Sequence, residues 1–397
     1  MNRLKGTAGF FRAAAVAWIS ILWAGTSGCA LHDYGVSLGL LNAPEVTAVT
    51  IKVAVPLEYA KQYTAFLGGV ELATEDIAQL GSPVDISVEV DDDRGSFSSA
   101  IDLVQGYAAD PAVIGVVGHW YSDICSSVTD LYNRSNKTLV VPTVSMTGLA
   151  TEDTPYIFQN IPSDRQIGKA LCDYAAAKGI SSVVIYYEDS AYGFTMSAEV
   201  EKYCSSLGIT VCDRISGLVR ERDMVDAKRK WDAAGYEAVI LISNVEEGAV
   251  FVNRLRALGS DAMVLCGDGM DSESLPKLLA GDAGELYVAS INNSETAKEG
   301  LIDFRERYEK KYGTQPDVWA FQGYDSVMLI AHAVAEHGVT TSEGLRDYLE
   351  SAREIDSIFG TLRFNLSHEV EGKSIYLMKV SRSGMEFVWG ENENGAK

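Results

Sequence analysis

Hydrophobic positions along this chain follow two different periods. Short runs rich in Val and Ile, such as Val113–Val117 and Ala238–Ser243, are continuously apolar, which is typical of strands covered on both faces. Between such runs lie segments such as Arg165–Ala177 and Tyr192–Leu207, whose apolar residues recur every three or four positions. This spacing predicts amphipathic helices. Strands that alternate with helices in this way predict an α/β fold built on parallel sheets.

The predicted elements form two long βα series. Predicted strands are Val49–Leu57, Val84–Val90, Val113–Val117, Thr138–Val141, Ser182–Tyr187, Ile209–Cys212, Ala238–Ser243, Ala262–Cys266 and Leu286–Ser290. Predicted helices include Tyr63–Leu80, Ser98–Ala109, Arg165–Ala177, Tyr192–Leu207 and Glu247–Leu258. The rhythm then changes to three successive helices and three closing strands, at Glu299–Lys311, Trp319–His337, Ser342–Ala352, Gly360–Phe364, Ser374–Val380 and Met385–Trp389. More than eight strands in two series favour two lobes, each a doubly wound sheet.

The first residues have the layout of an export signal. Basic residues at positions 3, 5 and 12 precede the apolar run Ala13–Ala24 and the small residues of Gly25–Gly28. The run is too short to span a bilayer, so we predict a signal peptide at 1–28 and a tether at 29–49. Cys29 follows Ser-Gly as in the bacterial lipobox, although Thr26 stands where that motif usually has Leu. We therefore expect a lipid anchor on Cys29, with cleavage without lipid as the alternative, and a periplasmic or cell-surface location.

Charge and motifs exclude several classes of function. Among 397 residues, 55 Asp and Glu outnumber 33 Lys and Arg, which gives a formal charge of −22. This balance disfavours nucleic acid as a partner, because nucleic-acid binding requires a basic face. The sequence contains no GxSxG elbow, no phosphate-binding GxxxxGK[ST] loop, no GxGxxG after a strand and no CxxC pair. We therefore predict no catalytic residue, no metal and no cofactor.

Five cysteines remain besides Cys29. An odd number in an oxidising compartment leaves at least one thiol unpaired. Cys204 ends a predicted helix and Cys212 lies in the strand that follows, so a bridge between them is one interpretation. The favoured alternative is that the thiols are small buried apolar groups.

In doubly wound sheets, ligands bind beyond the carboxyl ends of the strands. The loops at those ends are rich in hydroxyls, carboxylates and aromatic rings. They are Leu57–Gln62, Asp91–Ser96, Gly118–Ser122, Pro142–Thr147, Glu188–Gly193, Asn244–Glu247 and Gly267–Ser272. We therefore expect the functional site among these loops.

Four of the loops resemble motifs of a known family. Val116–Ser122 is an apolar strand that ends in Gly-His and reaches a Ser, and Val140–Ser145 is a strand-Pro segment that ends in a hydroxyl. Asp189–Gly193 contains an aspartate before Tyr-Gly, and Val264–Gly269 ends in an acid-Gly pair. This ordered set resembles the extracytoplasmic solute-binding proteins of branched-chain amino acid ABC transporters, the leucine/isoleucine/valine-binding type. The resemblance extends from about Val49 to Trp389.

The resemblance implies the type I periplasmic binding protein fold, in which three crossovers join two lobes around a solute. We place the crossovers near 161–162, 290–292 and 365–367. Lobe one then comprises 50–162 and 291–365, and lobe two comprises 163–290 and 366–397. The implied function is high-affinity binding of an amino acid or related small solute and its delivery to an ABC transporter permease. The alternative is a ligand-sensing subunit of a signalling system; in either case we expect a monomer that is not an enzyme.

The resemblance also implies the residues that bind the solute. Ser122, Ser145 and backbone groups near Thr143 would bind a carboxylate, since hydroxyls at helix N-termini act together with the helix dipole. Asp268 would bind an ammonium, and Tyr192 would stack and hydrogen-bond from the second lobe. The structural alternatives are helix caps for the two serines, a turn acid for Asp268 and a packing aromatic for Tyr192.

Two departures from the family pattern leave the solute open. Asn244 stands where the branched-chain binders have a ligand-contacting Tyr, and Trp120 stands where they have a smaller apolar residue. Trp120 would reshape the side-chain pocket or stack on a flat ligand; the alternative is an ordinary core tryptophan. Small, polar or aromatic amino acids, or an amide, all remain candidates.

Overall fold

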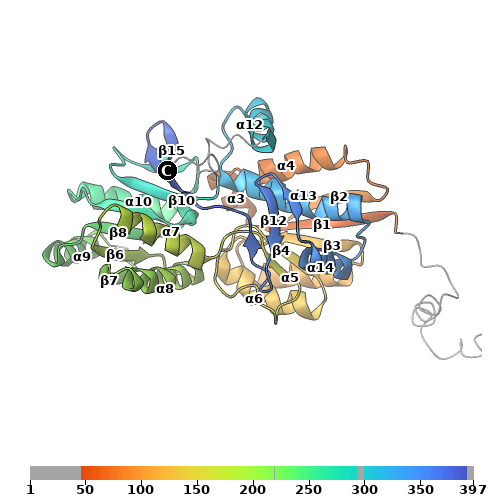
Figure 1. Cartoon of the computed structure of the whole chain (residues 1–397), viewed down its shortest axis with the longest axis horizontal. Helices are drawn as coiled ribbons and strands as arrows, with labels where there is room; N and C mark the ends of the chain where they lie inside the picture. The colour runs from red at the N-terminus through yellow and green to blue at the C-terminus, as the bar shows by residue number, and fades with distance from the viewer. Residues whose placement is uncertain (1–45, 219, 293–298, 391–397) are drawn as a thin grey trace, which may run out of the picture. The chain divides into compact units, whose positions relative to one another are not determined.

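The computed structural model describes residues 46–218, 220–292 and 299–390, so the predicted signal peptide and Cys29 lie outside the described residues. The first sheet has five parallel strands in the order β2-β1-β3-β4-β5 (Figure 1). Helices α4, α12, α13 and α14 cover one face of this sheet, and α5 and α6 cover the other. The elements of this lobe are β1 (Ala48–Val55), α3 (Leu57–Tyr63), α4 (Phe66–Ile77), β2 (Asp85–Asp92), α5 (Phe97–Ala109), β3 (Val113–Gly118), α6 (Ser122–Arg134), β4 (Thr138–Val141), β5 (Ile157–Gln159), α12 (Glu299–Tyr312), α13 (Val318–His337) and α14 (Ser342–Ser351).

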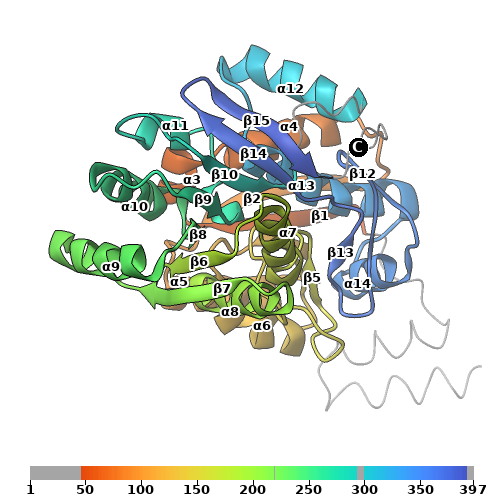
Figure 2. The ribbon, with the colours of Figure 1, turned by 60° about the vertical axis from the view of Figure 1, so that its left-hand side comes forward.

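The second sheet has seven strands in the order β15-β14-β10-β9-β8-β6-β7. Figure 2 shows β6 to β10 continuing into the hairpin β14–β15, which is the antiparallel edge of an otherwise parallel sheet. Helices α7 and α8 pack on one face, and α9, α10 and α11 pack on the other. The elements are α7 (Asp164–Ala177), β6 (Ser182–Tyr187), α8 (Ala191–Ser206), β7 (Thr210–Ser216), α9 (Glu221–Ala234), β8 (Ala238–Ile242), α10 (Val245–Ala257), β9 (Met263–Cys266), the 3₁₀ turn η1 (Asp268–Met270), α11 (Leu275–Leu278), β10 (Leu286–Ser290), β14 (Tyr376–Ser381) and β15 (Gly384–Gly390).

The two sheets confirm the predicted α/β fold with two doubly wound lobes. Strands β3, β8 and β10 are buried along their whole length, because helices cover both faces of each sheet. The lobe boundaries stay a prediction. A small third sheet bears on them: β11 (Ile355–Ser357), β12 (Gly360–Phe364) and β13 (Val370–Glu371) pair in that order. Because β13 pairs with β12, this sheet favours a third crossover after Glu371 rather than at 365–367.

Helical structure begins earlier than the sequence pattern predicts. The expected strand Val49–Leu57 ends at Val55, and the single expected helix Tyr63–Leu80 is instead the pair α3 and α4. The break lies at Thr64, whose backbone is extended, with φ −139° and ψ 162°. The next amide, Ala65 N–H, donates to Asp317 Oδ2 at 3.0 Å. The break therefore depends on a residue about 250 positions away, which no local pattern can reveal.

The described cysteines are all free thiols. Cys204, on α8, does not pair with Cys212 on β7; its Sγ lies 3.6 Å from Sγ of Cys172 on α7. Burial raises the pKa of the Cys125 thiol to about 12, so this thiol is protonated at neutral pH. The interpretation of the cysteines as buried apolar groups fits Cys125, Cys172, Cys204 and Cys266, whereas Cys212 is half-buried.

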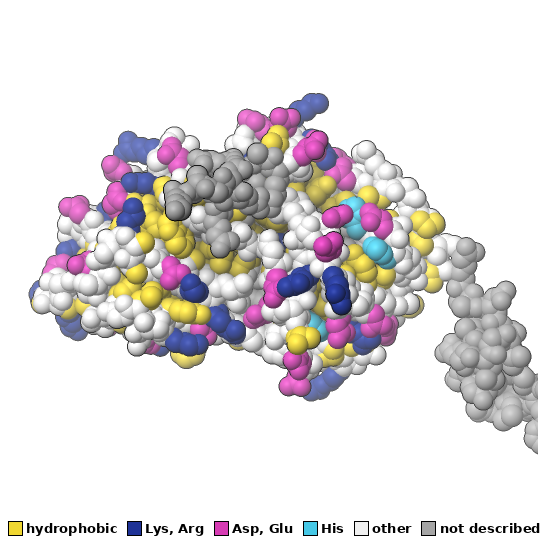
Figure 3. Space-filling model, in the orientation of Figure 1, with side chains coloured by type: hydrophobic (Ala, Val, Ile, Leu, Met, Phe, Trp, Pro, Cys, Tyr) yellow, Lys and Arg dark blue, Asp and Glu magenta, His cyan; other side chains and the backbone are white. Residues whose placement is uncertain are grey.

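The face of the molecule seen in Figure 3 carries mixed charge. On the face shown in Figure 3, acidic and basic side chains are interspersed rather than gathered into patches of one sign.

In the described part of the chain, no helix combines the length and apolar character that a membrane span requires.

A buried ion pair ties the predicted crossovers to α13. Lys373, between β13 and β14, donates from Nζ to Asp325 Oδ2 at 2.8 Å, and both side chains are at most 2% exposed. The same ammonium bonds Gln322 Oε1 at 2.6 Å and the Asn160 carbonyl, just after β5, at 2.9 Å. Gln322 Nε2 also donates to the Asn160 carbonyl, and to that of Pro142. Helix α13 therefore fixes two chain segments that lead from one lobe to the other.

We expect Lys373→Ala to lower the free energy of unfolding by about 3–5 kcal/mol, because Asp325 is left buried and unpaired. Urea unfolding of the purified protein measures this loss. The matched control is Lys379→Ala, which removes a pair with Glu285 of similar length, 2.6 Å, whose side chains are 39% and 48% exposed. The control should lose at most about 1 kcal/mol. Equal losses in the two variants would contradict the structural role of the buried pair.

Candidate functional site

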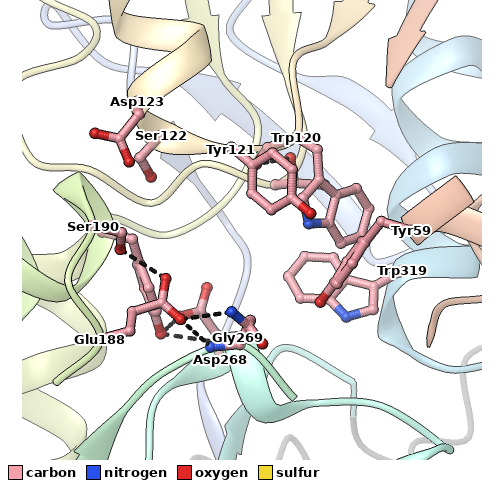
Figure 4. Close-up of a pocket in the computed structure, with 13 residues that line it drawn as sticks. Tyr59, Trp120, Tyr121, Ser122, Asp123, Glu188, Ser190, Asp268, Gly269 and Trp319 are labelled. Carbon is pink, nitrogen blue, oxygen red and sulfur yellow. Dashed lines mark hydrogen bonds between the residues drawn. The ribbon is translucent and has the colours of Figure 1, made fainter. Parts of the chain in front are cut away.

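A cavity of about 60 Å³ lies where the carboxyl ends of strands from both sheets meet. Its wall comes from both lobes, as the close-up in Figure 4 shows. An outer cavity of about 690 Å³ adjoins it and shares Tyr59 and Tyr121. The inner cavity is lined by Tyr59, Trp120, Tyr121, Ser122, Asp123, Thr143, Glu188, Ser190, Tyr192, Asn244, Asp268, Gly269 and Trp319. Except for Asp123 and Trp319, all these residues lie in the strand-end loops that the sequence singled out.

The first lobe contributes hydroxyls from the start of α6 and from the loop after β4. Ser122 is the first residue of that helix and lines the cavity. Thr143 also lines it, but its Oγ1 donates to the carbonyls of His119 and Trp120 at 3.2 and 3.3 Å. The Thr143 side chain therefore holds the segment that carries Trp120. Ser145 lies behind the wall, with its Oγ buried and in no hydrogen bond of standard geometry with any described residue.

The second lobe contributes a buried acid. Asp268 begins η1 and is 7% exposed, and its Oδ1 accepts a hydrogen bond from the Tyr192 hydroxyl at 2.9 Å. The Gly269 amide donates to the same hydroxyl at 3.2 Å. A Cβ at Gly267 would lie 2.4 Å from the Tyr192 oxygen, so only glycine leaves room for this pair. Burial raises the pKa of Asp268 to about 6, although the hydrogen bond from Tyr192 lowers it.

Asn244 lines the cavity as the N-cap of α10. Its Oδ1 accepts from the amides of Glu246 and Glu247, both at 3.1 Å. Its backbone N–H and its Nδ2 both donate to Glu188 Oε2, at 2.6 and 2.8 Å. Ser190 donates to the other oxygen of Glu188 at 2.7 Å. Glu188 is therefore held rigidly at the cavity wall by neutral donors.

Trp120 belongs to a cluster of aromatic rings. Its ring centroid lies 5.1 Å from that of Trp319, 5.6 Å from that of Tyr59 and 5.7 Å from that of Phe66. Figure 4 shows the rings of Tyr59, Trp120 and Trp319 on one side of the cavity and the carboxylates on the other. Trp120 is 9% exposed, so it is both a core residue and part of the wall.

One hydrogen bond crosses the cavity between helix N-termini of the two lobes. Asp123, the second residue of α6, accepts from the Ala191 amide at the start of α8, at 3.1 Å. A carboxylate between two helix N-termini is favourable, because the N-terminal end of a helix dipole is positive. The lobes are therefore in direct polar contact at this point.

A second buried acid lies behind the wall. Asp164, at the start of α7, is fully buried and accepts from Thr195 Oγ1 at 2.6 Å through one oxygen. Its other oxygen, Oδ1, has no partner among the described residues. Burial, together with the charge of Asp268, raises the pKa of Asp164 to about 7, although hydrogen bonds from Thr195 and Ser145 lower it. The site therefore holds two neighbouring buried acids, Asp164 and Asp268, whose ionised forms are disfavoured by burial.

The structure brings six of the seven predicted residues together around one cavity: Trp120, Ser122, Thr143, Tyr192, Asn244 and Asp268. Ser145 lies behind the wall instead, and the part that each residue plays in binding stays a prediction. Tyr59, Glu188 and Ser190 were missed although they stand in the predicted loops. Trp319, at the second position of α13, gave no local signal. No group of three or more His, Cys, Asp or Glu side chains in the described part of the chain is arranged to hold a metal.

Comparisons with protein families and with individual proteins point to the same class of protein. A family model described as periplasmic binding protein matches residues 58–385. The leucine-, isoleucine-, valine-, threonine- and alanine-binding protein of Pseudomonas aeruginosa is 22% identical over 278 residues, which are 68% of this chain and 73% of the relative. A Leu/Ile/Val-binding protein homologue of Brucella melitensis is 22% identical over 69% of this chain and 76% of its own.

Solved structures of substrate-binding proteins have the same fold as this chain. An ABC transporter substrate-binding protein of Desulfitobacterium hafniense in complex with Leu is 26% identical, with a TM-score of 0.76 over 86% of this chain and 100% of that chain. A leucine-binding protein of Thermotoga maritima, 19% identical, has the same fold, with a TM-score of 0.78 over 88% of this chain and 100% of that chain.

The raised pKa of Asp268 predicts how the solute-free protein responds to pH. An unfolded Asp has a pKa near 3.9, so the buried acid favours folding only while it is protonated. Its contribution is fully present below about pH 4 and is lost as the pH rises through about 6. Near pH 4, we expect Asp268→Asn to have the same free energy of unfolding as the wild type. At pH 7.5 the variant should be more stable by on the order of 2 kcal/mol, measured by urea titration. A variant that is less stable at pH 7.5 would show that the fold needs the charge.

Proposed function

The chain belongs to the periplasmic binding protein family, and from this premise we propose that it binds an amino acid or related small solute outside the cytoplasm and delivers it to an ABC transporter permease. The observation that carries the proposal is the cavity between the two lobes. It offers hydroxyls and a helix N-terminus on one side and the buried carboxylate of Asp268 on the other. The names of the relatives favour an amino acid as the class of solute.

The proposed contacts follow the chemistry of the wall. The solute's carboxylate binds the Ser122 hydroxyl and the free amides at the start of α6, supported by the helix dipole. The solute's ammonium binds Asp268, and Tyr192 holds that carboxylate in position. Thr143 contributes backbone groups, since its hydroxyl is already used within its own lobe. Ser145 supports Asp268 from behind.

Binding is coupled to closure in this scheme. The two charged ends of the solute bind groups on different lobes, so the solute has a higher affinity for the closed form than for an open one. Only such a difference in affinity shifts the population between two forms. Among the described residues, we assign 50–162, 291–292 and 299–371 to lobe one and 163–218, 220–290 and 372–390 to lobe two, with a few crossover residues absorbing the rotation.

The proposal predicts that Asp268→Asn weakens solute binding by about 2–5 kcal/mol, because the ammonium is left buried without its counter-charge. The twenty common amino acids and benzoate are first screened by thermal shift, where a solute at 100 times its Kd stabilises by about 2.7 kcal/mol. Isothermal titration then compares the variant with Asp232→Asn, which alters a half-exposed acid on α9.

The control should bind as the wild type does, and mass analysis should recover the solute unchanged. An unchanged Kd in Asp268→Asn would refute the assigned contact. Turnover of the solute would refute the binding role.

We further propose that a lipid on Cys29 anchors the protein at the cell surface or in the periplasm. The motive is the sequence Ser-Gly-Cys after an apolar run of twelve residues, Ala13–Ala24. Cys29→Ala should move the protein from the membrane fraction to the soluble fraction after cell lysis, and the wild-type N-terminal peptide should carry acyl chains by mass spectrometry. Stable retention requires more than one acyl chain. A Cys29→Ala protein that still sediments with membranes would contradict the anchor.

A further inference from the structure

The charges around the cavity specify the solute further than the proposed function does. We propose that the solute is an organic cation, an amine or quaternary ammonium with a net positive charge; this inference rests on the proposed binding function. Among the described residues that line the inner cavity, Asp123, Glu188 and Asp268 carry carboxylates, and none is Lys, Arg or His. A solute with no net charge would leave that excess of negative charge uncompensated.

The hydrogen bonds of these carboxylates hold them in place without neutralising them. Glu188 accepts from the hydroxyls of Ser190 and Ser243 and from the backbone and side-chain nitrogens of Asn244. Asp123 accepts from a backbone amide, and Asp268 accepts from a tyrosine hydroxyl. All of these donors are neutral groups. No ion pair to any of the three carboxylates forms within the described residues, so a cationic solute is the counter-charge that the wall lacks.

A second layer adds to this negative potential. Asp164 lies behind the wall, fully buried, with Oδ1 unpartnered among the described residues. It is near enough to Asp268 for the charge of one carboxylate to raise the pKa of the other. The hydroxyl of Ser145 is also buried and lies beside both acids, where it lowers the pKa of each. A positive charge in the cavity would favour the ionised form of both acids at once.

The route into the cavity is acidic as well. The outer cavity, which shares Tyr59 and Tyr121 with the inner one, is lined by Glu58, Asp92 and Glu246. Arg94 is the one basic residue among its described lining. Clefts lined by one sign of charge raise the local concentration of solutes of the opposite sign. The outer and inner cavities therefore favour the same sign of solute.

The remaining wall suits a cation too. Tyr59, Trp120 and Trp319 present ring surfaces opposite the carboxylates (Figure 4). The face of an aromatic ring is negative and attracts ammonium groups, most strongly for Trp, and rings are the usual partners of methylated ammonium. At the start of α6, where the solute's carboxylate is proposed to bind, Asp123 stands one residue after Ser122. A carboxylate is therefore tolerated in the solute but not required.

The test uses pairs of solutes that match in shape and differ in charge. Choline is compared with 3,3-dimethylbutan-1-ol, in which carbon replaces the quaternary nitrogen. L-lysine is compared with L-2-aminoheptanoate, in which a methyl group replaces the terminal ammonium. Isothermal titration of the full-length mature protein should give the cation of at least one pair a Kd at least about tenfold lower than that of its neutral partner.

Variants of the cavity wall test whether its carboxylates cause the preference for cationic solutes. Asp123→Asn and Glu188→Gln keep side-chain size and should reduce the ratio of the two Kd values toward one. Asp130→Asn, a 76% exposed acid at the far end of α6, should leave the ratio unchanged. Neutral solutes that bind as tightly as their cationic partners would overturn this inference and leave the proposed function intact. Binding of no amino acid, amine or benzoate would overturn both.

Discussion

The buried ammonium of Lys373 is the constraint on which the arrangement of the two lobes depends. It joins α13 to a segment that precedes β14 and to the chain just after β5, so two of the connections between lobes share one anchor. Gln322, one turn before Asp325 on α13, extends this anchor to the Pro142 carbonyl. The loop that carries Thr143 and Ser145 begins at Pro142. A single helix of lobe one therefore positions both the connections and part of the binding wall.

The sequence predicted the fold well where burial is symmetrical. Strands β3 and β8 are covered on both faces, and their continuous apolar runs marked them without reference to any partner. Short strands such as β5, β11 and β13 escaped prediction, because two or three residues carry no period. The division between α3 and α4 was not predicted for another reason. The carboxylate that accepts a hydrogen bond from the Ala65 amide belongs to Asp317, at the start of α13. Long-range hydrogen bonds of this kind leave no trace in local pattern.

The candidate site was predicted through topology more than through individual residues. Parallel strands bring their carboxyl ends together, so the loops predicted at those ends were enough to locate the cavity. The resemblance to a family singled out Asp268 and Tyr192, but it did not reveal that Glu188 adds negative charge or that Asp123 connects the lobes. Trp319 could not be found from local sequence, because α13 reaches the cavity only through packing of the first lobe. Ser145 does not line the inner cavity but lies beside Asp268, so its part in binding stays a prediction.

The hydrogen bond from Ala191 to Asp123 has a consequence for the proposed transport function. It joins the N-termini of α8 and α6 through groups of the protein alone, so part of the energy of closure is intrinsic to the protein. A larger population of the closed form raises the apparent affinity for solute, because less binding energy is used to close the lobes. If the protein delivers solute to a permease as proposed, closed molecules without solute would compete there with loaded ones. The strength of this contact, together with that of the hydrogen bond from Ser272 to the Tyr63 carbonyl, would then set the balance between affinity for scarce solute and unproductive encounters with the permease.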